Sequence, residues 1–234
     1  MKIEYKDMLL HEFRTALEAC PVAYVPVGLL EWHGDHLSLG TDLIRAEWIC
    51  QAAATSIGGI VLPGLYASCP GYSSYEGTLV FSVDTAVQLS LELAAQLEKV
   101  GFRAALFLSA HGGPAQDEYL SRLNAEYRGR MQLLALQVGE PIKVGDHAGP
   151  FETSDMLAAA PELVDLSRFA YPENPIRQYP VAEEQLWPAE KRPWVWRSDV
   201  RTTASSEKGN ANLAGIIAYC REWLSARGLL SQEG

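Results

Sequence analysis

Lysine and arginine are sparse in this sequence and form no cluster anywhere along it. The chain contains 19 of these residues against 29 aspartates and glutamates, which gives a formal net charge of −10 at pH 7. Nucleic acids and anionic membranes attract proteins through concentrated positive charge, so we expect neither as a partner. No apolar run approaches membrane-spanning length, and the N-terminal segment lacks the apolar core of a signal peptide. We therefore expect a soluble, cytoplasmic protein.

Cysteine is also scarce, and its spacing excludes two kinds of site. The four cysteines lie far apart and mostly within apolar helical or strand patterns: Cys20, Cys50, Cys69 and Cys220. Neither a disulfide framework nor a cysteine-type zinc site has such spacing, so we expect buried, reduced thiols. Internal repeats and low-complexity tracts are absent as well.

The apolar residues that are present alternate between strand and helix patterns. Strands are predicted from residue 22 and over residues 60–66, 79–83, 104–110 and 131–138. Helices are predicted over residues 6–20, 42–57, 84–100, 116–128, 152–160 and 211–227. Strands that alternate with helices of this length predict an α/β fold with a largely parallel sheet flanked by helices. A chain of 234 residues with 48% hydrophobic content fits a single domain over residues 1–234.

A long segment near the C-terminus follows neither pattern. Five prolines interrupt the region between residues 161 and 208, which also contains Trp187, Trp194 and Trp196. Because the tryptophans supply apolar anchors, we expect an ordered arm that covers the rest of the chain, not a disordered linker.

The first strand leads directly into a group of carboxylates and imidazoles. Glu31 and His33 are two residues apart, so in extended backbone their side chains leave the same face. Asp42 follows at the start of the next helix. Imidazole and carboxylate together suit divalent metals such as Zn²⁺ and Mn²⁺, which makes a metal site the favoured interpretation. The alternative is that Asp42 is only a helix N-cap and that the other two belong to a self-satisfied polar loop.

Two further polar groups follow the later strands. His111 stands where the strand at 104–110 gives way to a Gly-Gly turn, and Asp146, His147 and Glu152 follow the strand at 131–138. Open α/β sheets place their sites beyond the carboxyl ends of the strands, so these groups are expected at the same edge. Taken alone, His111 could equally be an ordinary turn histidine.

These three groups resemble the motifs of the creatininase family of metal-dependent amidohydrolases. The segment Gly28-Leu-Leu-Glu-Trp-His-Gly-Asp-His-Leu37, closed by Asp42, is similar to the family's first motif. The His-Gly-Gly turn at 111–113 and the segment 146–154, with Glu-Thr-Ser at its end, match the second and third motifs. Further matches at 77–78 and 204–209 extend the resemblance over nearly the whole chain.

The resemblance implies a small-molecule hydrolase with two divalent ions per chain, either Zn, Mn or Fe. Asp42 would bridge the ions, Glu31 and His111 would hold one, and His33 and Glu152 the other. His147 corresponds to the proton-transfer histidine, and Glu152 is counted with it in the catalytic set. His36 either orients a ligand or is satisfied within its own loop. The resemblance also implies a homo-oligomer, most simply a hexamer, with the Trp187–Trp196 arm near a neighbouring subunit.

Three departures from the family pattern concern the pocket and therefore the substrate. Trp32 stands where glutamine is usual, Ser38 where proline is usual, and Pro114 where asparagine is common. Creatininase itself takes its last metal-binding carboxylate from the position of Gly113, so Glu152 is assigned that role here, as in relatives with a His-Gly-Gly turn.

The expected reaction is cleavage of a C–N bond in a cyclic amide, small amide or formamide by a metal-activated water. Peptide trimming and hydrolysis of a cyclic keto-inositol also occur in the family. The alternative from another class is a non-catalytic, metal-containing ligand-binding or assembly protein.

Overall fold

Four parallel strands form the central sheet of the structure, a computed structural model that describes residues 2–180 and 194–230. The order across the sheet is β2-β1-β3-β4. The strands are β1 (Val22–Val27), β2 (Ile60–Val61), β3 (Ala104–Ser109) and β4 (Gln132–Gln137). β1, β3 and β4 pair along their whole length, starting from Val22 opposite Ala104 and Ala104 opposite Gln132. The predicted α/β fold with a parallel sheet is confirmed.

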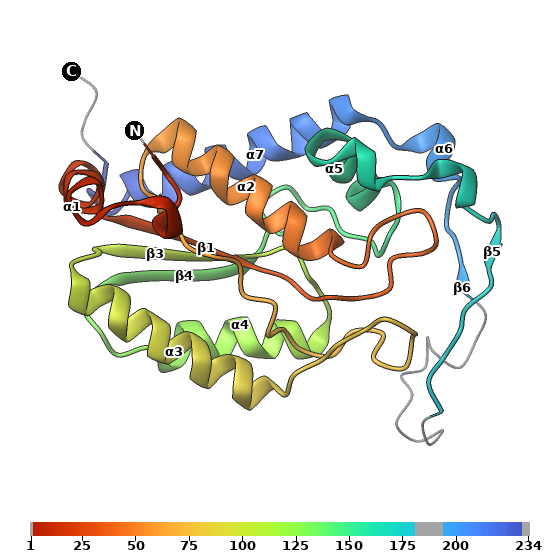
Figure 1. Cartoon of the computed structure of the whole chain (residues 1–234), viewed down its shortest axis with the longest axis horizontal. Helices are drawn as coiled ribbons and strands as arrows, with labels where there is room; N and C mark the ends of the chain where they lie inside the picture. The colour runs from red at the N-terminus through yellow and green to blue at the C-terminus, as the bar shows by residue number, and fades with distance from the viewer. Residues whose placement is uncertain (1, 181–193, 231–234) are drawn as a thin grey trace.

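Helices cover both faces of this sheet (Figure 1). One face packs against α3 (Val83–Val100) and α4 (Pro114–Glu126), and also against α1 (Leu10–Ala19). The other packs against α2 (Thr41–Ile57) and α7 (Ser206–Ser225). Along β1, Val25 and Val27 face the first group and Tyr24 the second. Burial on both faces explains why β1 and β3 are apolar throughout instead of alternating.

Some predicted boundaries are wrong. Residues 79–83 form no strand: Leu79 makes one isolated bridge to Leu30, and α3 already begins at Val83. Leu79 is 54% exposed, so the apolar residues at 79–83 do not form a buried strand. Residues 5–7 form a separate 3-10 helix (η1, Tyr5–Asp7) before α1, and α7 starts five residues earlier than expected.

The segment after α5 (Pro150–Ala159) folds back over the loops at the edge of the sheet. It contains short elements: η2 (Pro161–Leu163), η3 (Leu166–Arg168), β5 (Glu173–Asn174), β6 (Trp194–Val195) and α6 (Val200–Thr203). Phe169, Trp196 and Val200 from this arm are buried in a cluster with Trp32 and Met156. The described parts of the arm are thus ordered, as expected, and Trp187 lies outside the described residues.

The topology brings the polar segments of the sequence together. In a parallel sheet the carboxyl ends of β1, β3 and β4 lie at one edge, where the three polar groups follow them. No helix within the described part of the chain is long and apolar enough to cross a membrane.

Candidate active site

Five side chains converge at this edge of the sheet, and all five were singled out in the sequence: Glu31, His33, Asp42, His111 and Glu152. None is more than 5% exposed. They form two groups of three that share Asp42. One group contains Glu31 and His111, the other His33 and Glu152, and within each group the candidate ligand atoms lie within 4.8 Å of one another.

Asp42 stands between the two groups because of its place at the start of α2. Gly40 occupies the N-cap position, and Asp42, the second helical residue, extends into the cluster. Its Oδ1 lies 3.1 Å from His33 Nε2, and its Oδ2 lies 3.0 Å from His111 Nδ1. Each carboxylate oxygen therefore faces a different imidazole. The carboxylate of Asp42 does not cap the helix, which was the alternative considered for this residue.

Backbone carbonyls fix the orientation of both imidazoles. The Nδ1–H of His33 donates to the carbonyl of Glu31 at 3.0 Å, and the Nε2–H of His111 donates to the carbonyl of Cys69 at 3.0 Å. A carbonyl can only accept, so the hydrogen on each ring is assigned. The other nitrogen of each ring faces the carboxylates, the arrangement that orients metal-binding histidines in proteins.

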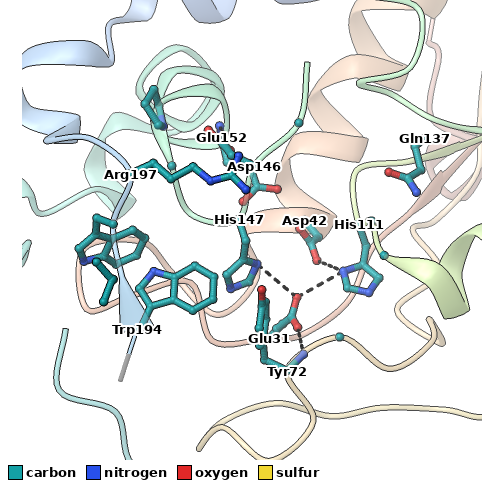
Figure 2. Close-up of a pocket in the computed structure, with 18 of the residues that line it drawn as sticks. Glu31, Asp42, Tyr72, His111, Gln137, Asp146, His147, Glu152, Trp194 and Arg197 are labelled. Carbon is teal, nitrogen blue, oxygen red and sulfur yellow. Dashed lines mark hydrogen bonds and ion pairs between the residues drawn. The ribbon is translucent and has the colours of Figure 1, made fainter. Parts of the chain in front are cut away.

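The carboxylates leave acceptor atoms without hydrogen-bond donors. Glu31 Oε1 accepts a 2.6 Å hydrogen bond from the backbone N–H of Tyr72 (Figure 2). Its Oε2 accepts no hydrogen bond from any described residue and faces the rings of His111 and His147. Asp42 Oδ2 accepts none either. Both unpartnered oxygens lie near His111 Nδ1, at 3.3 and 3.0 Å. Buried carboxylate oxygens are costly unless a cation faces them, and without metal the ring of His111 takes that place. Carboxylate oxygens and imidazole nitrogens at these positions are also the donor atoms that suit divalent metal ions.

The electrostatics of the cluster point in the same direction. Burial opposes a charged imidazole, but the carboxylates of Glu31 and Asp42 outweigh burial and raise the pKa of His111 to about 10. The pKa of His33 is likewise raised, because Asp42 and Glu152 outweigh its burial. Burial also opposes ionisation of Asp42, but the two histidines hold its carboxyl pKa far below the usual range. The cluster thus concentrates negative charge that cations compensate.

Glu152 is held by a residue that the sequence analysis missed. The fully buried guanidinium of Arg45 donates from Nη1 to Glu152 Oε1 at 2.8 Å and from Nη2 to Asp155 Oδ2 at 2.8 Å. The backbone N–H of Ala148 donates to Glu152 Oε2 at 2.6 Å, and this oxygen lies 3.4 Å from His33 Nε2. One available signal was the spacing of Arg45 three residues after Asp42, which places both on one side of α2.

His147 borders the cluster from the solvent side. Its Nε2–H donates to the carbonyl of Trp32 at 2.8 Å, so its Nδ1 is the nitrogen turned to the site, 3.9 Å from Glu31 Oε2 (Figure 2). Burial and the neighbouring His33 lower the pKa of His147, which favours the neutral ring. Glu31, His33 and His147 form a third possible group of ligands, so geometry alone permits His147 to be either a ligand or a proton carrier.

His36 lies one layer further out and does not face the candidate metal ligands directly. Its Nε2–H donates to the carbonyl of Ala148 at 3.1 Å, and burial lowers its pKa to about 4, so the ring is neutral. Ala148 adopts a left-handed backbone (φ 51°), and its N–H is the donor to Glu152. His36 therefore supports a carboxylate of the cluster through the backbone.

The cluster opens into a cavity of about 1030 Å³. Aromatic and glycine-rich segments from several parts of the chain line it, including Tyr72, Gly112, Gly113, Trp194 and Trp196. The arm thus forms a wall of its own chain's cavity.

The departures from the family pattern have local structural reasons. Trp32 is buried against Trp196 with ring centroids 6.2 Å apart, and it anchors the arm. Pro114 is the first residue of α4, where its fixed φ and missing N–H suit the start of a helix. Among the described residues, a Cβ at Gly113 would meet nothing within 4 Å, so this position contributes open space and no carboxylate to the site. The hydroxyl of Ser38 is buried without a partner, and nothing in the structure explains the choice of serine.

A parallel α/β sheet that ends in a buried carboxylate–imidazole cluster beneath a cavity is an arrangement that suits a metal-dependent hydrolase. The family described as creatininase, or creatinine amidohydrolase, matches residues 6–224, and the chain belongs to this family. It is therefore a metal-dependent amidohydrolase, as the motifs predicted.

Individual relatives agree with this assignment. Creatinine amidohydrolase of Pseudomonas putida is 28% identical over 244 aligned residues, which cover 91% of this chain and 93% of the relative. A mycofactocin precursor peptide peptidase of Mycobacterium ulcerans is 29% identical over 163 residues, covering 64% of this chain and 63% of the relative. A crystal structure of creatininase matches with a TM-score of 0.76 at 25% identity, covering 96% of this chain and 97% of that one.

Proposed function

We propose that this protein hydrolyses a C–N bond of a small amide, cyclic amide or formamide at a centre of two divalent metal ions. The observation that carries the proposal is the position of Asp42, whose two carboxylate oxygens face two separate groups of ligands. Its Oδ2 would join Glu31 and His111 around one ion. Its Oδ1 would join the other group around the second.

Glu152 completes the second group in this proposal. Its Oε2 lies 3.4 Å from His33 Nε2, and Gly113 offers no carboxylate in its place. Its other oxygen, Oε1, is held by Arg45, so one oxygen is left to face the ion. Relatives whose structures are designated as manganese and zinc–zinc forms of creatininase support Mn²⁺ and Zn²⁺ as candidates, and Fe²⁺ remains the third candidate.

The chemistry divides between the metal centre and His147. When bound, two divalent ions lower the pKa of water toward neutrality and polarise an amide carbonyl. His147 Nδ1 accepts a proton as the water attacks and returns it to the leaving nitrogen, whose bond to carbon then breaks. The Nε2–H bond to the Trp32 carbonyl keeps Nδ1 turned toward the site throughout. A histidine that carries protons and does not bind metal would have no role in a purely structural metal site.

The experiment is turnover of a substrate panel by metal-loaded protein. Lactams, formamides and dipeptides are incubated with protein reconstituted with Zn²⁺ or Mn²⁺, and chelated protein serves as the control. Metal-dependent release of amine from at least one amide class supports the proposal. No turnover of any class by fully loaded protein would favour a non-catalytic, metal-containing protein.

The peptide members of the panel have a specific motivation. The mycobacterial relative is described as a precursor peptide peptidase, and a cavity of about 1030 Å³ exceeds the volume that a small cyclic amide needs. Peptide trimming is therefore the second candidate function.

We also propose a homo-oligomeric state, with a hexamer as the expected form. Trp194 and Trp196 pack within their own chain, so the arm itself offers no support for an intersubunit role of these two residues. Light scattering at micromolar concentration distinguishes a hexamer from a monomer.

A further inference from the structure

Arg197 stands out among the charged side chains that line the cavity. Apart from the imidazoles of His111 and His147, the other charged side chains that line the cavity are carboxylates: Glu31, Asp42, Asp146 and Glu152. Arg197 follows β6, and its guanidinium reaches across the cavity above His147, toward Asp146 (Figure 2). Within residues 2–180 and 194–230, its guanidinium makes no hydrogen bond or ion pair, whereas Arg45 and Arg201 are both paired with carboxylates.

Asp146, toward which the guanidinium points (Figure 2), does not form an ion pair with Arg197 within the described residues. Asp146 already accepts hydrogen bonds from the backbone N–H groups of Phe151 and Glu152, which it caps at the start of α5. Arg197 is therefore a solvent-exposed cation at the wall of the cavity, and no carboxylate of residues 2–180 and 194–230 pairs with it.

The charges around the cavity indicate that the group bound by Arg197 is an anion. In the proposed centre, two divalent ions balance the four lining carboxylates. Arg197 then leaves one positive charge facing the cavity, which an anionic group on a bound molecule would neutralise. Because Arg197 is exposed, solvent and salt screen this attraction, so it acts through direct contact with the bound group.

We infer that the substrate carries a carboxylate, which the Arg197 guanidinium binds at the mouth of the cavity. The inference rests on the proposed function, because it assumes that the amide to be cleaved sits at the metal centre. The planar fork of a guanidinium matches the two oxygens of a carboxylate. A phosphate ester is disfavoured because Arg197 is the lone arginine or lysine among the cavity-lining residues of the described chain. The neighbouring Trp194 offers an apolar surface for the body of such a substrate.

The first test measures binding without turnover. Zinc-loaded protein is titrated by calorimetry with 3-phenylpropanoate and with the neutral 3-phenylpropanol. R197M should weaken binding of the carboxylate by about 10- to 100-fold, the loss typical of one charge-assisted contact, and leave the alcohol unaffected. R197K, which keeps the charge but not the fork, should fall in between. R201M is the matched control, because Arg201 is exposed and paired with Asp199.

The second test uses a matched pair of amides. N-formylphenylalanine and its decarboxylated analogue N-formylphenethylamine differ only in the carboxylate. R197M should raise KM for the first compound with little change in kcat and should leave the second unchanged.

The outcomes separate the inference from the proposed function. Equal binding of 3-phenylpropanoate by R197M and the unmodified protein means that the carboxylate sits elsewhere, for example on the metal, and overturns the inference. The same holds if the decarboxylated formamide is cleaved as efficiently as its parent. If neither formamide is cleaved but carboxylate binding depends on Arg197, the inference stands and formamide hydrolysis fails.

Discussion

The buried arginine beside Glu152 offers a demanding test of how this site is built. Arg45 is fully buried and donates four hydrogen bonds, one to the carbonyl of Ala110, one to Glu152 and two to Asp155. Arg45→Met would leave two buried carboxylates without their cation. Removal of one partner from a buried ion pair typically costs about 3–5 kcal/mol of folding free energy. That is a large part of the roughly 5–15 kcal/mol that stabilises most domains.

Urea unfolding measures the free energy of unfolding of each variant. The protein is first treated with a chelator, because bound metal would stabilise the fold and mask the loss of stability. Arg45→Lys keeps the charge but not the fork and should cost less than Arg45→Met. The double variant Arg45→Met/Asp155→Asn should cost less than the sum of the two single changes, because the second change removes a carboxylate that the first left unpaired. A loss below about 1 kcal/mol for Arg45→Met, or strict additivity in the double variant, would refute this account.

Four further predictions concern the metal centre. Asp42→Ala should lose both ions, whereas Glu152→Ala should weaken the binding of mainly one ion. Elemental analysis of each variant after dialysis checks this. If Glu152→Ala still binds two ions tightly, another carboxylate holds the second ion. His147→Ala should keep both ions and the fold but lose about 10²–10⁴-fold in turnover; loss of metal would instead make it a ligand. Gly71→Ala should weaken metal binding because its Cβ would overlap Glu31 Oε1. Gly145→Ala is the control, because its Cβ would meet no described atom within 4 Å, and it should leave metal binding unchanged. Equal effects of the two changes would contradict the importance of the close approach of Gly71 to Glu31. Zinc binding near pH 7 should release about two protons per chain, because the raised pKa values of His33 and His111 keep both imidazoles charged until metal displaces their protons. Calorimetry in buffers of different ionisation enthalpy counts the released protons. A measurement of no proton release would falsify this assignment of charge to the two histidines.

The convergence of the candidate metal ligands could be predicted because its signal lies along the chain. Glu31 and His33 directly follow an apolar run, and such runs become the central strands of a parallel sheet. Parallel strands bring their carboxyl ends to one edge, so His111 had to lie near them once its strand was recognised. The family motifs then assigned the shared position to Asp42, which spacing alone left open between a ligand and a helix cap.

The parts that were missed depend on contacts between distant segments. Arg45 lies on a helix, and a single charged residue on a helix normally indicates a solvent-facing position. Its burial depends on Asp155, which lies 110 residues further along the chain. The backbone N–H of Tyr72 that holds Glu31 has no signal in the side-chain pattern at all. In the same way, the apolar residues at 79–83 resemble a strand, but within the described residues their pairing is limited to the isolated bridge between Leu79 and Leu30.

The origin of the cavity walls has a consequence for how this enzyme can diversify. All candidate metal ligands come from residues 31–152, whereas Trp194, Trp196 and Arg197 come from the arm that follows α5. Substitutions in the arm can therefore alter which molecule enters while the candidate metal ligands stay the same, although Trp194 also packs against His147. Gene duplicates could acquire new substrates through this one segment, and libraries randomised at positions 194–198 are a direct way to redirect the enzyme in the laboratory.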